Sequence, residues 1–215
     1  MRPLIVTGTD TGIGKTVVSA MLTLALDGIY WKPIQSGTAD GTDRQHVAAI
    51  TGLPEERFRP ERSVLREPLS PHRAAELDGV EISADEMDLP ENIPSGHRLI
   101  IEGAGGVLVP INRQILQVDL FARWHAPAVL CARTNLGTIN HTLLSLEALK
   151  RRGVRVLGIV FVGESMPDSE RTIIDFGETR SLGRLPILPK LDADALKAAF
   201  AASFNRRDFE AADER

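Results

Sequence analysis

The sequence predicts a doubly wound α/β fold with a mainly parallel sheet, organised as a single domain over residues 1–215. Five apolar runs are continuous rather than alternating, as expected for strands that are buried on both faces of a sheet. These runs occupy residues 4–7, 29–34, 99–102, 128–132 and 154–162. Helical patterns separate them, and this alternation favours a parallel sheet with helices on both sides. Ligands of such sheets bind beyond the carboxyl ends of the strands.

The bulk composition is that of an ordinary globular protein, with 43% hydrophobic and 25% charged residues. A net charge of −4 and a pI of about 5.8 provide no broad basic surface, so we expect neither a nucleic-acid partner nor a membrane partner. No apolar run approaches the roughly 20 residues of a membrane span. Residues 1–3 lead straight into a strand rather than a signal peptide, and we expect a cytoplasmic location. Cys131 is the only cysteine and is expected to be a buried strand residue.

The first apolar run leads directly into a glycine-rich turn that ends in Lys-Thr. The turn reads Gly8-Thr9-Asp10-Thr11-Gly12-Ile13-Gly14-Lys15-Thr16. Its glycines would allow backbone N–H groups to surround a phosphate at the positive end of the following helix. The common spacing would place a glycine at residue 9 instead of residue 8, so the loop is a variant. The sequence therefore predicts a P-loop fold and a nucleoside triphosphate site.

Helical patterns are predicted at residues 16–26, 43–51, 118–125 and 140–152. The last of these has leucines on one face, Thr138 or Asn140 as a candidate N-cap, and a terminating Gly153. Short helices are expected at residues 71–77 and 83–87, within a segment rich in proline and charge. Residues 205–215 are mostly charged, and we expect a frayed or solvated tail there.

Lys32 follows the second predicted strand, in the segment Trp31-Lys32-Pro33-Ile34-Gln35-Ser36-Gly37. A lysine at the carboxyl end of a strand beside the triphosphate site could stabilise developing negative charge. By itself the pattern fits a lysine in a surface turn better than it fits a catalytic lysine.

Two acidic residues are candidate magnesium ligands. Glu102 ends the third predicted strand, directly before Gly103-Ala104-Gly105-Gly106, and Asp43 begins a helix. Mg²⁺ prefers carboxylate, hydroxyl and phosphate oxygens, and acidic residues at strand ends facing a phosphate loop commonly hold it. Asp43 could instead serve only as a helix N-cap. None of the five histidines has metal-ligand spacing.

Several motifs occur in a fixed order: GTDTGIGKT, WKPIQSG, EPLSPH, EGAGGVLVPI and LGTINHTLLSLEAL. This combination resembles the dethiobiotin synthetase family over about residues 5–149. The resemblance implies a homodimeric, Mg²⁺- and ATP-dependent ligase that joins CO₂ to 7,8-diaminononanoate and closes the ring of dethiobiotin. ADP and phosphate would be released through a carbamate and a carbamic-phosphoric anhydride.

The resemblance also implies residue roles. Lys32 is the implied catalytic residue, which stabilises the carbamate and the phosphoryl transfer. The implied metal ligands are Thr16, Asp43 and Glu102. The implied nucleotide-binding positions are Gly12, Ile13, Gly14, Lys15, Thr16, Val17, Asp43, Glu102, Gly103, Ala104, Gly105, Val162, Gly163, Leu185, Pro186 and Ile187. The implied substrate-binding positions are Thr9, Thr11, Ser36, Leu136, Gly137, Thr138 and Asn140, with residues 136–140 acting across the dimer interface.

One departure from the family concerns the base of the nucleotide. The family often has Asn-Asp after the strand at residues 154–161, where this sequence has Val162-Gly163. We therefore expect that other nucleoside triphosphates could replace ATP.

Two other classes of protein carry related loops. An amidotransferase-type ligase of the cobyrinate kind would need a glutaminase domain with a catalytic cysteine, for which the chain is too short. A partitioning or regulatory ATPase would normally have a second lysine early in its loop, where this chain has Asp10.

Overall fold

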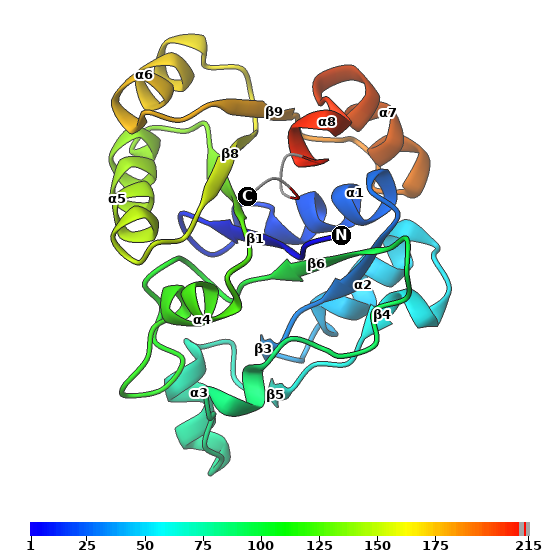
Figure 1. Cartoon of the computed structure of the whole chain (residues 1–215), viewed down its shortest axis with the longest axis vertical. Coiled ribbons are helices and arrows are strands. Elements are labelled where there is room, and N and C mark those ends of the chain that lie inside the picture. The colour runs from blue at the N-terminus through cyan, green and yellow to red at the C-terminus, as the bar shows by residue number, and fades with distance from the viewer. Residues whose placement is uncertain (211–212, 214–215) are drawn as a thin grey trace.

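The continuous apolar runs form one parallel sheet of seven strands in the computed structural model, which describes residues 1–210 and 213 (Figure 1). The strand order is β4-β2-β6-β1-β7-β8-β9. Its strands are β1 (Leu4–Gly8), β2 (Gly28–Trp31), β4 (Phe58–Arg59), β6 (Arg98–Glu102), β7 (Ala128–Arg133), β8 (Val156–Val162) and β9 (Ser181–Leu185). A separate pair, β3 (Ile34–Ser36) and β5 (Ser63–Leu65), forms a small second sheet.

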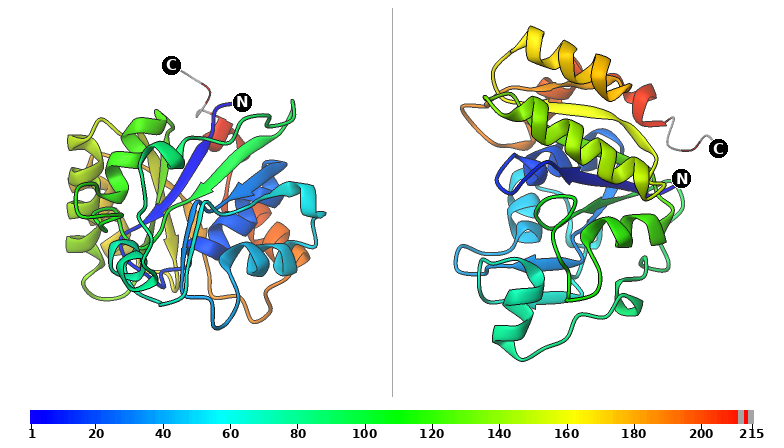
Figure 2. Two further views of the ribbon diagram at one scale, coloured as in Figure 1. Left: turned by 90° about the horizontal axis from the view of Figure 1, so that it is seen from below. Right: turned by 90° about the vertical axis from the view of Figure 1, so that its left-hand side faces the viewer.

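Helices cover both faces of the large sheet, as Figure 2 shows. They are α1 (Lys15–Ala25), α2 (Asp43–Thr51), α3 (Pro71–Asp78), α4 (Gln117–Trp124), α5 (Thr138–Arg151), α6 (Pro167–Gly177), α7 (Ala193–Ser203) and α8 (Arg206–Glu210). Two 3₁₀ turns, η1 (Glu55–Arg57) and η2 (Asp85–Met87), complete the elements.

The central strand β1 shows why the sheet is covered on both sides. Leu4 and Val6 pack into a core that includes Met21 of α1, whereas Ile5 packs into a second core that includes Phe121 of α4. Successive side chains of a strand point to opposite faces, so a strand buried on both faces must be apolar throughout. The predicted doubly wound, mainly parallel fold is confirmed.

The predicted strand at residues 29–34 is wrong in its second half. β2 ends at Trp31, and the chain crosses to the small sheet at Lys32 and Pro33. Proline has no N–H to donate to a sheet, so the pairing stops there. The carbonyl of Pro33 accepts from the backbone N–H of Ser63 at 3.0 Å and thereby leads into the second sheet.

The last quarter of the chain is more ordered than the sequence predicts. α6, β9 and α7 lie there without a predicted counterpart, and α8 falls inside the expected frayed tail. Phe209 of α8 is fully buried, and its ring lies 5.9 Å from that of Phe200. One aromatic residue therefore anchors a segment that is otherwise charged. The rest of that tail prediction, at residues 211–212 and 214–215, lies outside the described residues.

Two smaller predictions also need correction. α5 begins at Thr138 after Gly137, whose φ of 94° is left-handed, and no side chain caps this helix. The Thr138 hydroxyl donates instead to the carbonyl of Arg133. The expected helix at residues 83–87 is only the single turn η2.

The sheet register brings the chemistry-bearing strand ends together. In parallel pairing Val6 lies opposite Glu102, Gly8 opposite Cys131, and Trp31 opposite Ile101. The segments that follow these strands therefore meet at one edge of the sheet. Within the part of the chain that the structure describes, no helix has the length and apolar character needed to cross a membrane.

Candidate active site

The P-loop connects β1 to the N-terminus of α1. Gly12 and Gly14 have φ values of 70° and 95°, which L side chains rarely adopt. A Cβ added at Gly14 would approach Val162 to 3.0 Å, so the loop also lies tightly against the end of β8. The first turn of α1 directs its N–H groups toward this edge, where they can bind an anion.

Lys15 lies folded back inside its own loop. Its Nζ donates to the carbonyl of Asp10 at 2.7 Å, and the residue is 6% exposed. Burial lowers the pKa of Lys15, and the cation Lys32 lowers it further, although Glu102 and Asp43 oppose this effect. A buried ammonium group whose hydrogen bond goes to one backbone carbonyl can bind an anionic ligand, and a phosphate group is such a ligand.

Two carboxylates, a hydroxyl and an ammonium group meet beside Lys15. The Thr16 hydroxyl lies 3.1 Å from Asp43 Oδ1 and 2.9 Å from Glu102 Oε1, and it can donate to one of them at a time. Lys32 Nζ pairs with Asp43 and lies 3.3 Å from Glu102 Oε1. The lysine therefore belongs to the site, and it is not a lysine in a surface turn.

The charge state of Lys32 follows from these neighbours. Burial alone would lower the pKa of Lys32, but Glu102 and Asp43 outweigh burial and raise it. The amine therefore stays protonated at neutral pH. Tyr30 supports the cluster from β2, where its hydroxyl donates to Glu102 Oε2 at 3.0 Å. Burial and the nearby Glu102 raise the pKa of Tyr30 well above its ordinary value, so it remains a donor.

The oxygen atoms of this cluster suit Mg²⁺. Among the described residues, no group of three or more His, Cys, Asp or Glu side chains gathers around a metal-sized site. Thr16, Asp43 and Glu102 instead offer one hydroxyl and two carboxylates within hydrogen-bond distance of one another. Mg²⁺ in nucleotide sites commonly takes one or two carboxylates and completes its shell with water and phosphate. The residues present therefore fit this ion.

A cavity of about 280 Å³ opens beside Lys32 and Asp43. Thr11, Ser36, Ala104 and Gly105 line it, together with residues 68–71, which were not predicted as site residues. The Ser36 hydroxyl is buried and has no hydrogen-bond partner in the described protein. It is therefore free to contact a ligand in this cavity.

The glycine-rich turn after β6 forms the wall between the cavity and the P-loop. Gly103 donates its N–H to Val6 at 3.0 Å, and a Cβ at this position would approach Phe121 to 2.8 Å. A Cβ at Gly106 would lie 3.4 Å from the carbonyl of Thr9. The small residues therefore allow this turn to pack directly against the P-loop.

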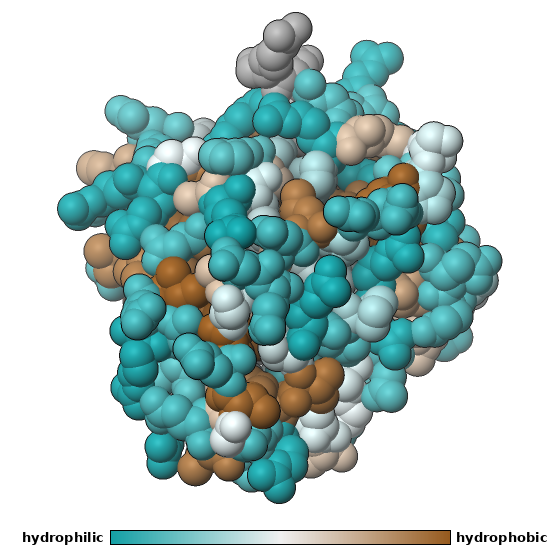
Figure 3. Space-filling view, turned by 60° about the horizontal axis from the view of Figure 1, so that its bottom comes forward, coloured by the Kyte–Doolittle hydropathy of each residue, from teal (hydrophilic) through white to brown (hydrophobic). Residues whose placement is uncertain are grey.

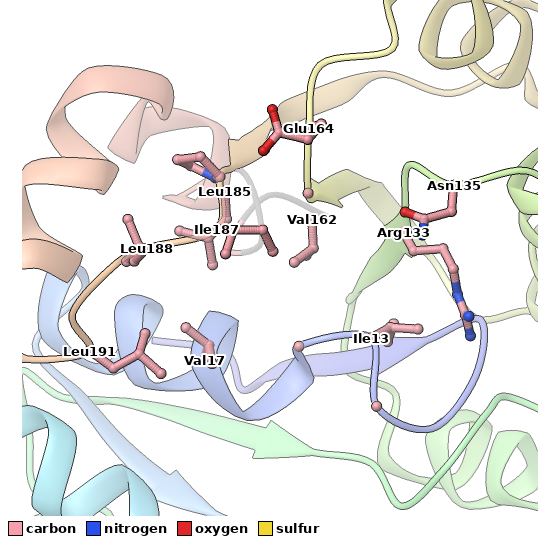
Figure 4. Close-up of a pocket in the computed structure, with 14 residues that line it drawn as sticks. Ile13, Val17, Arg133, Asn135, Val162, Glu164, Leu185, Ile187, Leu188 and Leu191 are labelled. Carbon is pink, nitrogen blue, oxygen red and sulfur yellow. The ribbon is translucent and has the colours of Figure 1, made fainter.

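A larger cavity of about 540 Å³ extends from the P-loop to the ends of β8 and β9 (Figure 4). The predicted positions Gly12, Ile13, Gly14, Val17, Val162, Gly163, Leu185, Pro186 and Ile187 all line it. Sequence reasoning missed Arg133, Asn135, Glu164, Leu188 and Leu191, which also line it. The polar residues at or within two residues of the ends of β7 and β8 were the available signal, because the carboxyl ends of these strands meet at the same edge.

Other predicted substrate positions lie apart from Lys32. Leu136, Gly137 and Asn140 are exposed, and Thr138 is buried. Thr9 lines a third cavity of about 370 Å³, formed with residues 106–109 and the face of α5. Within one copy of the chain, the structure does not bring residues 136–140 to the Lys32 cavity.

Known proteins match nearly the whole chain. A model of the AAA domain family matches residues 2–195. A protein named ATP-dependent dethiobiotin synthetase BioD from Rhodopseudomonas palustris (strain HaA2) is 56% identical over 97% of this chain and 96% of its own length. The protein of the same name from Afipia carboxidovorans is 56% identical over 97% of this chain and 98% of its own. That from Novosphingobium aromaticivorans is 53% identical over 97% of this chain and all of its own.

Solved structures resemble the chain in fold at low identity. The Pyrococcus furiosus cell division ATPase MinD is 16% identical, has a TM-score of 0.56, and aligns over 98% of this chain and 99% of its own. A ParA family ATPase from Chlorobium tepidum is 12% identical, has a TM-score of 0.55, and aligns over all of this chain and 95% of its own. These likenesses show a P-loop NTPase fold. The identities above 50% over nearly the full length are decisive, and the chain belongs to the dethiobiotin synthetase family.

Proposed function

We propose that the protein is an ATP-dependent dethiobiotin synthetase, a ligase of biotin biosynthesis. Its substrates would be 7,8-diaminononanoate, CO₂ and ATP. The relatives' shared name supports the overall reaction. One observation carries the assignment to residues: Lys32 and Glu102 lie beside the P-loop residue Thr16, at the carboxyl edge of the sheet.

The reaction divides into three steps. One substrate amine attacks CO₂ and loses a proton to give a carbamate. A carbamate oxygen then attacks the γ-phosphorus of ATP, forming a carbamic-phosphoric anhydride and releasing ADP. The second amine attacks the carbonyl carbon of the anhydride, so that the ring closes and phosphate leaves. Little covalent chemistry falls to the protein, whose task is positioning and charge neutralisation.

The residues divide this task between them. Lys15 and the N-terminus of α1 would hold the outer phosphates, and the amine would leave Asp10 to do so. Thr16, Asp43 and Glu102 would hold Mg²⁺, which neutralises phosphate charge when bound. Lys32 lines the cavity beside Glu102, so it would face the carbamate and the transferred phosphoryl group, and its raised pKa keeps it cationic. Ser36 and Thr11 would contact the diamine in the cavity beside Lys32.

We propose that ATP binds in the 540 Å³ cavity, with its base between the ends of β8 and β9. Val162 and Gly163 supply no side-chain amide or carboxylate to read the base. CTP, GTP and UTP are therefore alternative phosphoryl donors to be tested beside ATP.

We further propose a homodimer in which residues 136–140 of one copy complete the substrate site of the other. Large apolar side chains support it, since Leu108, Leu136 and Leu144 are all more than half exposed. Leu108 and Leu144 line the cavity next to Thr9. Figure 3 shows apolar groups gathered within a mostly polar surface on the face it presents. Apolar patches on a soluble protein commonly mark interfaces.

We also propose a cytoplasmic location, where ATP for this reaction would be available.

An isotope experiment tests the reaction and its intermediate together. The protein is mixed with 7,8-diaminononanoate, Mg²⁺, ATP and freshly dissolved C¹⁸O₂ in a rapid single turnover. The proposed path leaves one oxygen of CO₂ in dethiobiotin and transfers the other to phosphate, so mass spectrometry should detect ¹⁸O in both products. Dethiobiotin formed with unlabelled phosphate would refute the anhydride, and absence of dethiobiotin would refute the proposed function.

A further inference from the structure

The far end of the 540 Å³ cavity has few groups that could distinguish one base from another. A nucleotide whose phosphates occupy the P-loop extends its base toward residues 162–164, residues 185–188 and Leu191. The side chains there are aliphatic, apart from Glu164. Apolar walls can pack against any nucleobase, because all nucleobases have similar flat faces.

The backbone of Gly163 is already occupied. Its N–H donates to the carbonyl of Leu185 at 3.0 Å, and its carbonyl accepts from Arg184 Nη1 at 3.1 Å. A Cβ added here would approach Thr134 Oγ1 to 2.6 Å, so the position cannot carry a side chain that reads the base. Gly163 therefore shapes the cavity without selecting its ligand.

The segment after β9 does offer free backbone groups. Across the described residues, neither Ile187 nor Leu188 has a hydrogen-bond partner for its N–H or its carbonyl. A segment with both donors and acceptors can pair with either kind of base edge. These groups can contact a base, but they provide little discrimination among bases.

Two other polar side chains of the cavity lie at its opposite end. Arg133 Nη2 pairs with Asp10 Oδ2 at 2.7 Å, and Figure 4 shows Arg133 and Asn135 near Ile13 of the P-loop. They are therefore placed beside the phosphates rather than the base.

Glu164 is the one acidic side chain among the residues that line the cavity. Figure 4 shows its carboxylate directed toward the Leu185–Ile187 segment, over the base end. In the described part of the chain this carboxylate has no hydrogen bond or ion pair, and the residue is exposed. An ionised carboxylate only accepts hydrogen bonds. It would attract an exocyclic amine and repel a carbonyl oxygen.

We propose that Glu164 makes the site selective for nucleobases that carry an exocyclic amine at C6 of a purine or at C4 of a pyrimidine, which are adenine and cytosine. Guanine and uracil present a carbonyl oxygen at the corresponding position, which the carboxylate disfavours. The inference rests on the proposed nucleotide site and adds its substrate class. Val162 and Gly163 have no side chain that can form a hydrogen bond with the edge of the base. Glu164, at the rim of the cavity, provides this hydrogen bond instead.

Matched pairs of nucleotides give the sharpest test. ITP differs from ATP by a carbonyl in place of the amine, and UTP differs from CTP in the same way. Dissociation constants of all four are measured by calorimetry on the full-length protein, without 7,8-diaminononanoate, for the wild type, Glu164→Gln and Glu86→Gln. Glu86 is an exposed glutamate outside the cavity and serves as the matched control.

The wild type and Glu86→Gln should bind ATP and CTP about tenfold more tightly than ITP and UTP, respectively. Glu164→Gln should reduce both ratios to within about twofold, because a carboxamide can accept from an amine or donate to a carbonyl. The KM for 7,8-diaminononanoate should not change, which excludes a general loss of structure. Equal binding of ATP and ITP by the wild type would overturn the inference, as would ratios unchanged in Glu164→Gln. Failure of every nucleotide to bind would instead overturn the proposed function.

Discussion

Replacing Lys32 by alanine tests how the site separates binding from catalysis. The ammonium group pairs with both Asp43 and Glu102, and the Lys32 side chain is 10% exposed. Its removal should reduce kcat by about 10³, since loss of one donor to a developing negative charge typically costs 10²–10³ or about 3–4 kcal/mol. ATP affinity should change less than threefold, because the phosphates would be held by Lys15 and the N-terminus of α1.

The same substitution should alter stability in a metal-dependent way. Breaking a buried ion pair costs about 3–5 kcal/mol, but Glu102 would keep its contacts with Thr16 and Tyr30. Asp43 also has a side chain that is 23% exposed. We therefore expect the free energy of unfolding to fall by about 2 kcal/mol, and Mg²⁺ to restore part of it by replacing the lost positive charge.

Steady-state formation of dethiobiotin, nucleotide calorimetry and urea unfolding with and without Mg²⁺ measure these effects. Lys197→Ala is the control, because Lys197 is an exposed lysine on α7. A Lys32→Ala variant with wild-type turnover would refute the catalytic role of the amine. A variant that loses ATP binding together with turnover would show that Lys32 holds the nucleotide instead.

Three further predictions concern groups around and behind the site. Tyr30→Phe leaves Glu102 Oε2 without its 3.0 Å donor, so urea unfolding should show a loss of about 1.5–3 kcal/mol, and an unchanged midpoint would contradict this. Asp213→Asn weakens the 2.5 Å ion pair with the buried guanidinium of Arg98 and should lower the free energy of unfolding by about 1 kcal/mol. Scanning calorimetry should then show a Tm lower by about 2–4 °C. Burial raises the pKa of Cys131 from 9.0 to about 12, so iodoacetamide at pH 8 should label only the unfolded protein. Because the unfolded thiol loses its proton first, stability relative to Cys131→Ala should fall by about 1.4 kcal/mol per pH unit between pH 9 and pH 12, and parallel pH profiles would refute this.

The strands that could be predicted are those that are buried on both faces, because their sequences are continuous apolar runs. β1, β6, β7 and β8 were found within one or two residues of their ends. β9 was missed because Ser181–Leu185 mixes serine, glycine and arginine with two leucines, as an edge strand can. α8 was missed because its burial depends on one residue, Phe209. A single aromatic residue gives no periodicity to detect.

The site was predictable where a residue directly follows a strand. Lys32 and Glu102 were placed together because parallel strands end at the same edge, and the structure brings them within 3.3 Å. The contact of Tyr30 with Glu102 depends on β2 lying next to β6, which the order of the chain does not indicate. Glu164 required knowledge of which way the loop after β8 turns. Such contacts follow from the strand order and loop path rather than from local sequence.

Because the chain changes sheet at Pro33, the residues of the candidate site are carried by two different sheets. The large sheet and the helices α1 and α2 carry Thr16, Asp43 and Glu102, whereas the small sheet carries Ser36. If the proposed residue roles hold, diamine recognition can diverge by exchange of β3, β5 and the adjoining loop while the residues proposed for phosphoryl transfer stay unchanged. Lys32 lies between β2 and β3, so a change of substrate made in the small sheet would have to leave this connection, and its contacts with Asp43 and Glu102, in place.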